Sequence, residues 1–403
     1  MFISTNNNIS NRHYYKYFAI VLLFFIVIFF TPSVKPAYAD EVEKSLSETI
    51  ESQLEKLDLT ALERYLSGIS SNFEGLFSGS FIENLRNIIS GQKQFDYSNF
   101  FSYVVSIIFD DLIKVIPMLS AIVAICVVCS LLGQLSPDKQ GEKISKVIYF
   151  ACFALVATII FSAFKSLLSS TTGVLESIKT QMQLIFPILL TLITSIGSVV
   201  TVSTFKPAVA LLSSSIVSMI SSIVLPIFIF SFIFNIVGNM SSNVKLEKCA
   251  KFLSSMFKWL LGTIFTVFMT VLSLQGILAS VSDNISIKTA KFALKSYVPL
   301  IGNFMSDGLG FILASGVLIK NAVGLTGLFL LLSTIVLPLV EIIIFMLGLK
   351  LVAAIVEPLS NNNMSNFIYG CSKCLSMLIA CIVAVGFMYI LSVGLLMCTS
   401  NIF

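Results

Sequence analysis

The chain has 403 residues, of which 56% are hydrophobic and only 11% are charged. A typical soluble domain is about 25% charged, so a soluble protein of this length would have too few charges to cover its apolar surface, and lipid must cover it instead. The formal net charge is +4, but no soluble face carries the clustered basic residues that binding a nucleic acid requires, which argues against a nucleic-acid partner.

The first 39 residues have the three parts of a secretory signal peptide. Arg12 and Lys16 precede an apolar core over 17–30, and Ala37-Tyr38-Ala39 matches an A-x-A cleavage site. The core is shorter than the roughly 20 residues that cross a bilayer. We therefore expect 1–39 to be a signal peptide, with an uncleaved anchor as the alternative. Either way, the chain from Asp40 onward starts outside the cytoplasm.

The next segment, 40–111, is acidic, with 13 acidic and 5 basic residues. Leu46, Ile50 and Leu54 recur at helical spacing with acidic residues between them, and glycines punctuate the rest. The pattern predicts an acidic extracytoplasmic helical region. Such a region would either cap the membrane domain or offer a docking surface to a partner.

From residue 112 to 403 the chain alternates long apolar runs with short links that carry lysine. The apolar runs are 115–133, 147–164, 184–202, 208–237, 260–281, 298–318, 323–356 and 375–398. Runs of this length with so few charges are typical of transmembrane helices. The sequence therefore predicts an all-α, multi-pass transmembrane domain over 112–403 with about seven spans, one more or one fewer. For 184–205 and 297–320, a span and a re-entrant segment are both open readings.

Three similar landmarks suggest an internal repeat. They are Val115-Ile116-Pro117, Val224-Leu225-Pro226 and Val336-Leu337-Pro338, spaced by about 110 residues. Between them, Ser177-Ile178-Lys179-Thr180 recurs as Ser286-Ile287-Lys288-Thr289. If all three segments of one unit cross the membrane, successive copies are inverted, as in many transporters; if the third segment re-enters, the copies are parallel.

The segment from Tyr297 to Gly324 combines closely spaced Gly and Pro with an acidic residue. Such residues disfavour a straight lipid-facing helix and are tolerated where a broken helix lines a cavity. The alternatives are a surface loop or a Gly-rich helix packed tightly on its neighbours. The candidate pore or broken-helix residues are Pro299, Gly302, Asn303, Asp307, Gly308, Gly310, Lys320 and Asn321.

Two further charges lie inside apolar runs, Glu341 and Lys350. An ionised side chain at the centre of a membrane helix costs about 2.5–3.5 kcal/mol on insertion scales, so it usually faces a partner or water. Both residues are therefore candidate intramembrane polar groups, although Lys350 can also reach an interface with its long side chain.

No catalytic pattern is present in the sequence. There is no G-x-x-x-x-G-K-[ST] phosphate loop, and the single histidine, His13, lies in the predicted signal peptide. The eight cysteines all fall after residue 111, mostly in apolar runs, where they behave as small hydrophobes. We expect neither an enzyme nor a bound metal or cofactor.

Three strings resemble the core of the stage III sporulation protein AE family of endospore-forming bacteria. They are LQGILASVSD (274–283), IKTAKFALKSYVPLIGNFMSDGLG (287–310) and LIKNAVGLTGL (318–328). The resemblance implies a membrane subunit in the mother-cell membrane around the forespore. There it would assemble with sister stage III sporulation membrane proteins and a forespore-side partner. Together these proteins would form a channel complex required for spore development, to which this chain would contribute pore or platform. The alternative is a stand-alone secondary transporter with an intramembrane polar site.

Overall fold

The structure is a computed structural model that describes residue 50 and residues 60–69, 97–134, 139–211, 215–240, 246–297, 302–358 and 362–399. These residues all belong to one compact unit, Leu46–Phe403, and none of them forms a β-strand. The predicted signal peptide at 1–39 and most of the acidic region at 40–111 lie outside the described residues. The described part is all-α, as the apolar runs predict.

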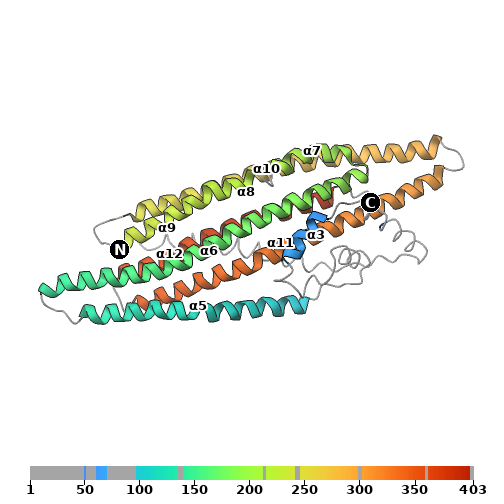
Figure 1. Ribbon diagram of the computed structural model, residues 1–403. Helices are drawn as coiled ribbons and strands as arrows, with labels where there is room; N and C mark the ends of the chain where they lie inside the picture. Colours follow the sequence, from blue (N-terminus) through green and yellow to red (C-terminus); the bar gives the residue numbers. More distant parts are fainter. Residues whose placement is uncertain are drawn as a thin grey trace, which may run out of the picture. The chain divides into compact units, whose positions relative to one another are not determined.

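The elements follow one another as helices joined by short links (Figure 1). They are α3 (Thr60–Ile69), α5 (Tyr97–Gln134), α6 (Lys139–Ser195), α7 (Val199–Leu211), α8 (Val217–Met219), the π-helical turn η3 (Ile220–Val224), α9 (Leu225–Met240), α10 (Glu247–Tyr297), α11 (Gly302–Val356) and α12 (Asn362–Cys398).

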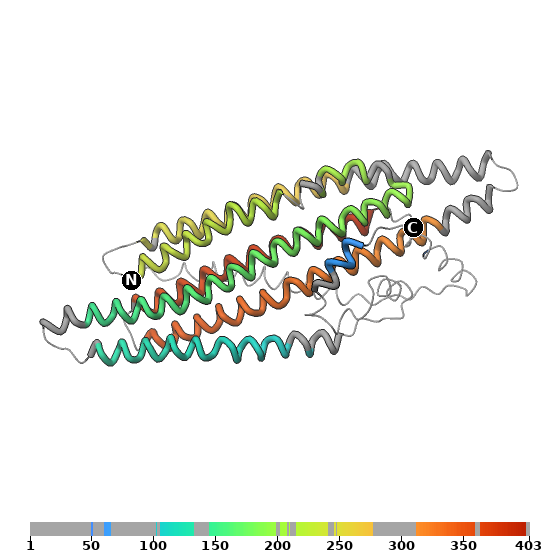
Figure 2. The backbone as a smooth tube through the Cα atoms, in the orientation of Figure 1, coloured from blue at the N-terminus to red at the C-terminus, as the bar shows by residue number. Residues whose placement is uncertain are grey.

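Six stretches of the described helices are long and apolar enough to cross a membrane. Two pairs of apolar runs that the sequence separates lie in single helices. The 57-residue α6 contains both 147–164 and most of 184–202, and the 55-residue α11 contains 323–356 and most of 298–318. Figure 2 shows each as one uninterrupted tube. At 1.5 Å per residue, each is about 85 Å long.

The polar link inside α6 stays helical because it carries an apolar stripe at helical spacing. Leu167, Leu175 and Ile178 are buried on one face of the link, while Glu176 and Ser169 are exposed on the other. Helical stability in proteins comes chiefly from packing such a face. The link therefore continues the helix rather than ending it.

Successive long helices are antiparallel, so their ends collect at two ends of the bundle (Figure 1). At one end α5, α9 and α11 finish and α6, α10 and α12 begin. We call this the lysine end, because the sequence there contains Lys139, Lys143, Lys146, Lys245, Lys248 and Lys251. At the opposite, far end, α6 turns into α7, and α10 is followed by α11. The far end also carries lysines, since Lys206 lies in α7 and Lys288, Lys291 and Lys295 lie in the last ten residues of α10.

The turn from α6 to α7 depends on one left-handed residue, Gly197, whose φ is 88°. Its N–H donates to the carbonyl of Thr194 (2.9 Å), and the N–H of Ser198 donates to the carbonyl of Ile193 (3.2 Å). This is a glycine-based helix cap, which satisfies carbonyl groups at the end of α6. The chain can therefore reverse within three residues.

The core of the bundle is built around α12, in which Phe367, Leu378 and Tyr389 are fully buried. Tyr389 donates a hydrogen bond to the carbonyl of Gly327 on α11 (3.2 Å). On the opposite side of α6, Phe164 stacks on Phe232 of α9 with ring centroids 3.5 Å apart. Small residues and aromatic stacks of this kind bring membrane helices close together.

The three proline landmarks lie in three helices that run in the same direction. Pro117 lies inside α5 and Pro338 inside α11, while Pro226 follows the π-helical turn η3 at the start of α9. Each of these helices leads at the lysine end into an antiparallel partner: α6, α10 or α12 (Figure 1). The landmarks therefore mark three helical hairpins of the same sense, the arrangement that parallel copies would have.

Candidate functional site

Four side chains from three helices form a charged cluster where α5, α6 and α11 meet: the buried Asp111 and the exposed Lys114 of α5, with the partly buried Ser170 of α6 and Glu341 of α11. The ammonium group of Lys114 donates to Oδ1 of Asp111 at 3.0 Å. The carboxyl group of Glu341 lies beside the hydroxyl of Ser170 and within electrostatic reach of Asp111 and Lys114. The cluster therefore joins α5, α6 and α11 at one level.

The charges of this cluster do not balance. Asp110 and Glu341 also lie near Lys114, so one ammonium group faces three carboxyl groups. Asp111 is 8% exposed, and its Oδ2 atom has no hydrogen-bond partner among the described residues. A half-satisfied buried carboxylate attracts a cation or a proton. The cluster can therefore bind positive charge as well as tie the helices together.

A second polar contact, which we call the polar bridge, consists of Tyr65, Gln181 and Thr334. The Gln181 amide nitrogen on α6 donates to the Thr334 hydroxyl on α11 (2.6 Å) and to the Tyr65 hydroxyl on α3 (3.2 Å). The Tyr65 hydroxyl donates to the carbonyl of Ser177 (3.3 Å). Burial raises the pKa of the Tyr65 phenol, because the phenolate is disfavoured away from water. The bridge attaches the acidic region to the transmembrane domain.

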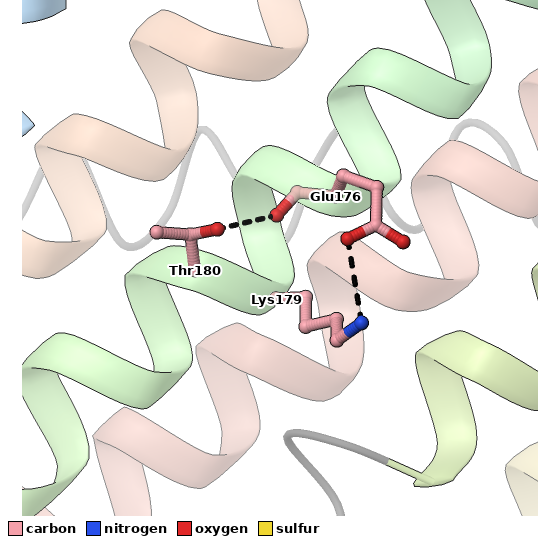
Figure 3. A network of polar contacts seen from close by, with 3 residues as sticks. All are labelled: Glu176, Lys179 and Thr180. Carbon is pink, nitrogen blue, oxygen red and sulfur yellow. Dashed lines mark hydrogen bonds and ion pairs between the residues drawn. The ribbon is translucent and has the colours of Figure 1, made fainter.

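Between the cluster and the bridge, α6 carries a polar surface (Figure 3). Lys179 lies 3.4 Å from Glu176, and the Thr180 hydroxyl donates to the Glu176 carbonyl at 2.9 Å. The Glu176 side chain is 59% exposed, so this pair contributes little to stability. The exposed Glu176 side chain indicates that this face of α6 is in contact with water.

The first predicted candidate residues lie at the start of α11. Gly302, Asn303, Asp307, Gly308 and Gly310 occupy its first three turns, while Pro299 lies outside the described residues. Of the three readings open for 297–324, the described residues follow the Gly-rich helix, which runs without interruption from Gly302; residues 298–301 lie outside the described residues. A helical glycine costs only about 1 kcal/mol relative to alanine, which the packing of a long helix readily offsets.

Lys320 and Asn321 lie farther along α11, where it packs against the end of α12. Lys320 is fully buried and donates a hydrogen bond to the carbonyl of Thr399. A cation at a helix C-terminus is stabilised by unsatisfied carbonyl groups and by the helix dipole. Lys320 therefore caps α12. The Oδ1 atom of Asn321 is buried and has no hydrogen-bond partner among the described residues.

The two predicted intramembrane charges are not brought together. Glu341 belongs to the charged cluster, whereas Lys350 lies about 13 Å farther along α11 toward the lysine end. Sequence reasoning missed Asp111 because it treated this residue as the last of the acidic region. The spacing of Asp111 and Lys114, three residues apart in a predicted helix, was the available signal. Gln181, Tyr65 and Thr334 carried no signal, since their contacts join distant segments.

Comparison with known proteins agrees with the resemblance found in the sequence. A family model described as stage III sporulation protein AE matches residues 80–400. A relative, the stage III sporulation protein AE of Bacillus subtilis (strain 168), is 25% identical over 346 residues, covering 86% of this chain and 87% of that protein. No solved structure matches the chain.

Proposed function

Because the chain belongs to the stage III sporulation protein AE family, we propose that it is a membrane subunit of a channel complex between mother cell and forespore. The family match over 80–400 carries the proposal, since it includes all six apolar helices. Family membership supports a role in stage III of sporulation, and the bundle provides a multi-pass body embedded in lipid.

In this proposal the chain lies in the mother-cell membrane around the forespore and contributes the pore or its platform. Sister stage III sporulation membrane proteins and a forespore-side partner complete the complex. Two regions are our candidates for its working parts. One is the charged cluster with Glu341; the other is the start of α11 with Pro299, Asp307 and Gly308, continuing to Lys320 and Asn321.

The test is complementation in a spore-forming host that lacks its own copy of the gene. The wild-type chain should restore heat-resistant spores, whereas Asp111→Asn combined with Glu341→Gln should lower their number by about tenfold or more, because the cluster loses the charges that hold positive charge there. Lys179→Ala, which removes an exposed pair, is the matched control. Protein level is measured by immunoblot in each strain.

Two outcomes would contradict the proposal. A strain without the gene that sporulates normally would show that the chain is not needed in development. Normal spore counts from the double variant, at wild-type protein level, would leave the complex in place but remove the charged cluster from its working parts.

A stand-alone secondary transporter is the second candidate, and the unbalanced charges of the cluster favour it. Carboxyl groups held between helices bind the coupling cations of many transporters. Purified protein in liposomes is the measurement. Uptake of a small solute driven by a proton or sodium gradient, without partner proteins, would support the transporter, and its absence would favour the channel subunit.

A further inference from the structure

The exposed face of α6 changes its chemistry along the helix. Over its first half, toward the lysine end, it exposes large hydrophobic side chains: Val147, Phe150, Leu155 and Phe161, each more than half exposed. Such a face is suited to acyl chains. Large exposed apolar faces are rare on proteins surrounded by water.

Beyond Phe161 the same helix exposes polar or small side chains. The exposed residues are Ser162, Lys165, Ser166, Ser169, Gly173, Glu176, Gln183, Pro187, Thr191, Thr194 and Ser195. Its buried residues remain mostly apolar, with Phe186, Leu189 and Ile193 fully buried and Thr171 and Gln181 as the polar exceptions. This is the pattern of a helix with one face in a protein core and the other in water.

Among the residues of the other long helices whose side chains the structure describes, most exposed large hydrophobic residues lie in the part nearer the lysine end. The side chains of 277–311, in the far parts of α10 and α11, lie outside that description. The apolar stretches are Phe109–Leu132 in α5, Met219–Met240 across α8 to α9, Phe252–Leu274 in α10 and Leu337–Ile355 in α11. Each spans about 20 residues, or about 30 Å of helix, which is the thickness of the hydrocarbon core of a bilayer. Ile312 and Leu325 are isolated exceptions on α11, and single exposed apolar residues are common.

A second observation indicates that the half of the bundle nearer the far end is in contact with water. The helix α3 contacts α6 at Ser177 and Gln181, about 25 Å past Phe161. This helix carries Glu63 and an exposed Arg64. Charges of both signs in a segment that starts outside the cytoplasm are not stable in hydrocarbon. The surface to which α3 attaches must therefore lie outside it.

From these observations we propose that the hydrocarbon core ends near the charged cluster, and that the bundle beyond it stands outside the membrane as a helical stalk. The stalk comprises α6 from Lys165, α7, the far parts of α10 to α12, and the attached α3. From Lys165 to Ser195 it rises about 45 Å from the membrane surface. Asp111, Lys114 and Glu341 then lie at the level of the lipid headgroups, where charges cost least.

The distribution of lysines indicates on which side of the membrane the stalk lies. Positive residues in short loops and at helix ends mark the cytoplasmic side. Six lysines lie at the lysine end, against four at the far end: Lys206, Lys288, Lys291 and Lys295. The stalk therefore points away from the cytoplasm, in agreement with the acidic region that starts outside. This placement of the bilayer does not depend on the channel function, and it is testable in cells that never sporulate.

The experiment is cysteine labelling of the full chain with a membrane-impermeant maleimide. In a background with Cys249→Ser and Cys398→Ser, single cysteines replace four exposed residues of α6: Gln183 and Thr191 in the stalk, and Ala151 and Ala154 in the lipid-facing half. We expect Gln183→Cys and Thr191→Cys to label in intact cells at least about tenfold more than the other pair. Labelling after denaturation in SDS normalises for protein amount.

Two results would overturn the stalk. Protection of both stalk positions in intact cells and in inside-out vesicles would show that lipid surrounds the whole length of α6. Labelling of both positions only in inside-out vesicles would place that half in the cytoplasm. Using two positions in each half guards against a variant that fails to fold, and an immunoblot of the membrane fraction identifies such a variant.

Discussion

Lys320 shows how one residue can be charged, fully buried and structural. Its ammonium group caps the C-terminal end of α12 through the carbonyl of Thr399. The sequence singles out Lys320 as a candidate pore or broken-helix residue, but it does not show that a helix end meets it. A lysine in the membrane domain therefore need not mark a conduction path.

We predict that Lys320→Glu destabilises the protein by at least about 2 kcal/mol, because a buried carboxylate would face carbonyl oxygens at the negative end of a helix. The measurement is thermal unfolding of the purified protein in detergent. Lys165→Glu, at an exposed position of α6, is the matched control and should change the midpoint little. Equal losses in the two variants would show that Lys320 does not cap α12.

At the scale of elements, α9 and α12 are held together by a close approach at Gly370. A side chain there would collide with the amide of Asn235, which donates to the Phe367 carbonyl (3.3 Å) and contacts the Cys371 sulfur (3.4 Å). The amide cannot move aside without losing these hydrogen bonds. Small residues have this role wherever membrane helices pack closely.

Gly370→Ala should therefore destabilise the bundle by about 1–3 kcal/mol, the cost of crowding a packed site. Gly394 lies on the same helix with no other side chain near its Cα, and Gly394→Ala should be neutral or slightly stabilising because alanine favours the helix. Unfolding in detergent compares the two variants. A larger loss at Gly394 would contradict the packing described here.

The sequence predicts the helices better than it predicts their ends. Apolar runs of spanning length identified every long helix of the described residues, because a run of about 20 apolar residues must bury itself as a helix in lipid or against neighbouring helices. The same criterion divided α6 and α11, since it treats a polar stretch such as 165–183 as a link. Whether a polar stretch continues a helix depends on what packs against its apolar stripe. The cluster and the polar bridge depend on tertiary contacts in the same way.

At the scale of the whole molecule, six antiparallel helices place the end of α12 on the same side as the start of α5. Two exposed native cysteines report on the two sides: Cys249 at the lysine end and Cys398 at the far end. They allow the orientation to be measured without introducing new side chains.

We predict that a chain retaining only Cys398 labels from outside intact cells, and that a chain retaining only Cys249 labels only in inside-out vesicles, because lysine-rich ends stay in the cytoplasm. A chain without either cysteine gives the background, since the other six native cysteines are buried. Labelling of both cysteines from the same side would mean an even number of crossings between them and would contradict the three helices that separate them here.

The unbroken course of α6 has a mechanical consequence. A helix of 57 residues that passes the membrane surface without a hinge behaves as a lever, with the headgroup region as its fulcrum. A partner that pulls the tip of the 45 Å outer arm sideways by about 5 Å tilts the rod by about 6°. The inner arm, about 40 Å long, must then swing the opposite way by about 4 Å at its end. A force applied to the outer arm would thus reach the opposite end of the helix directly.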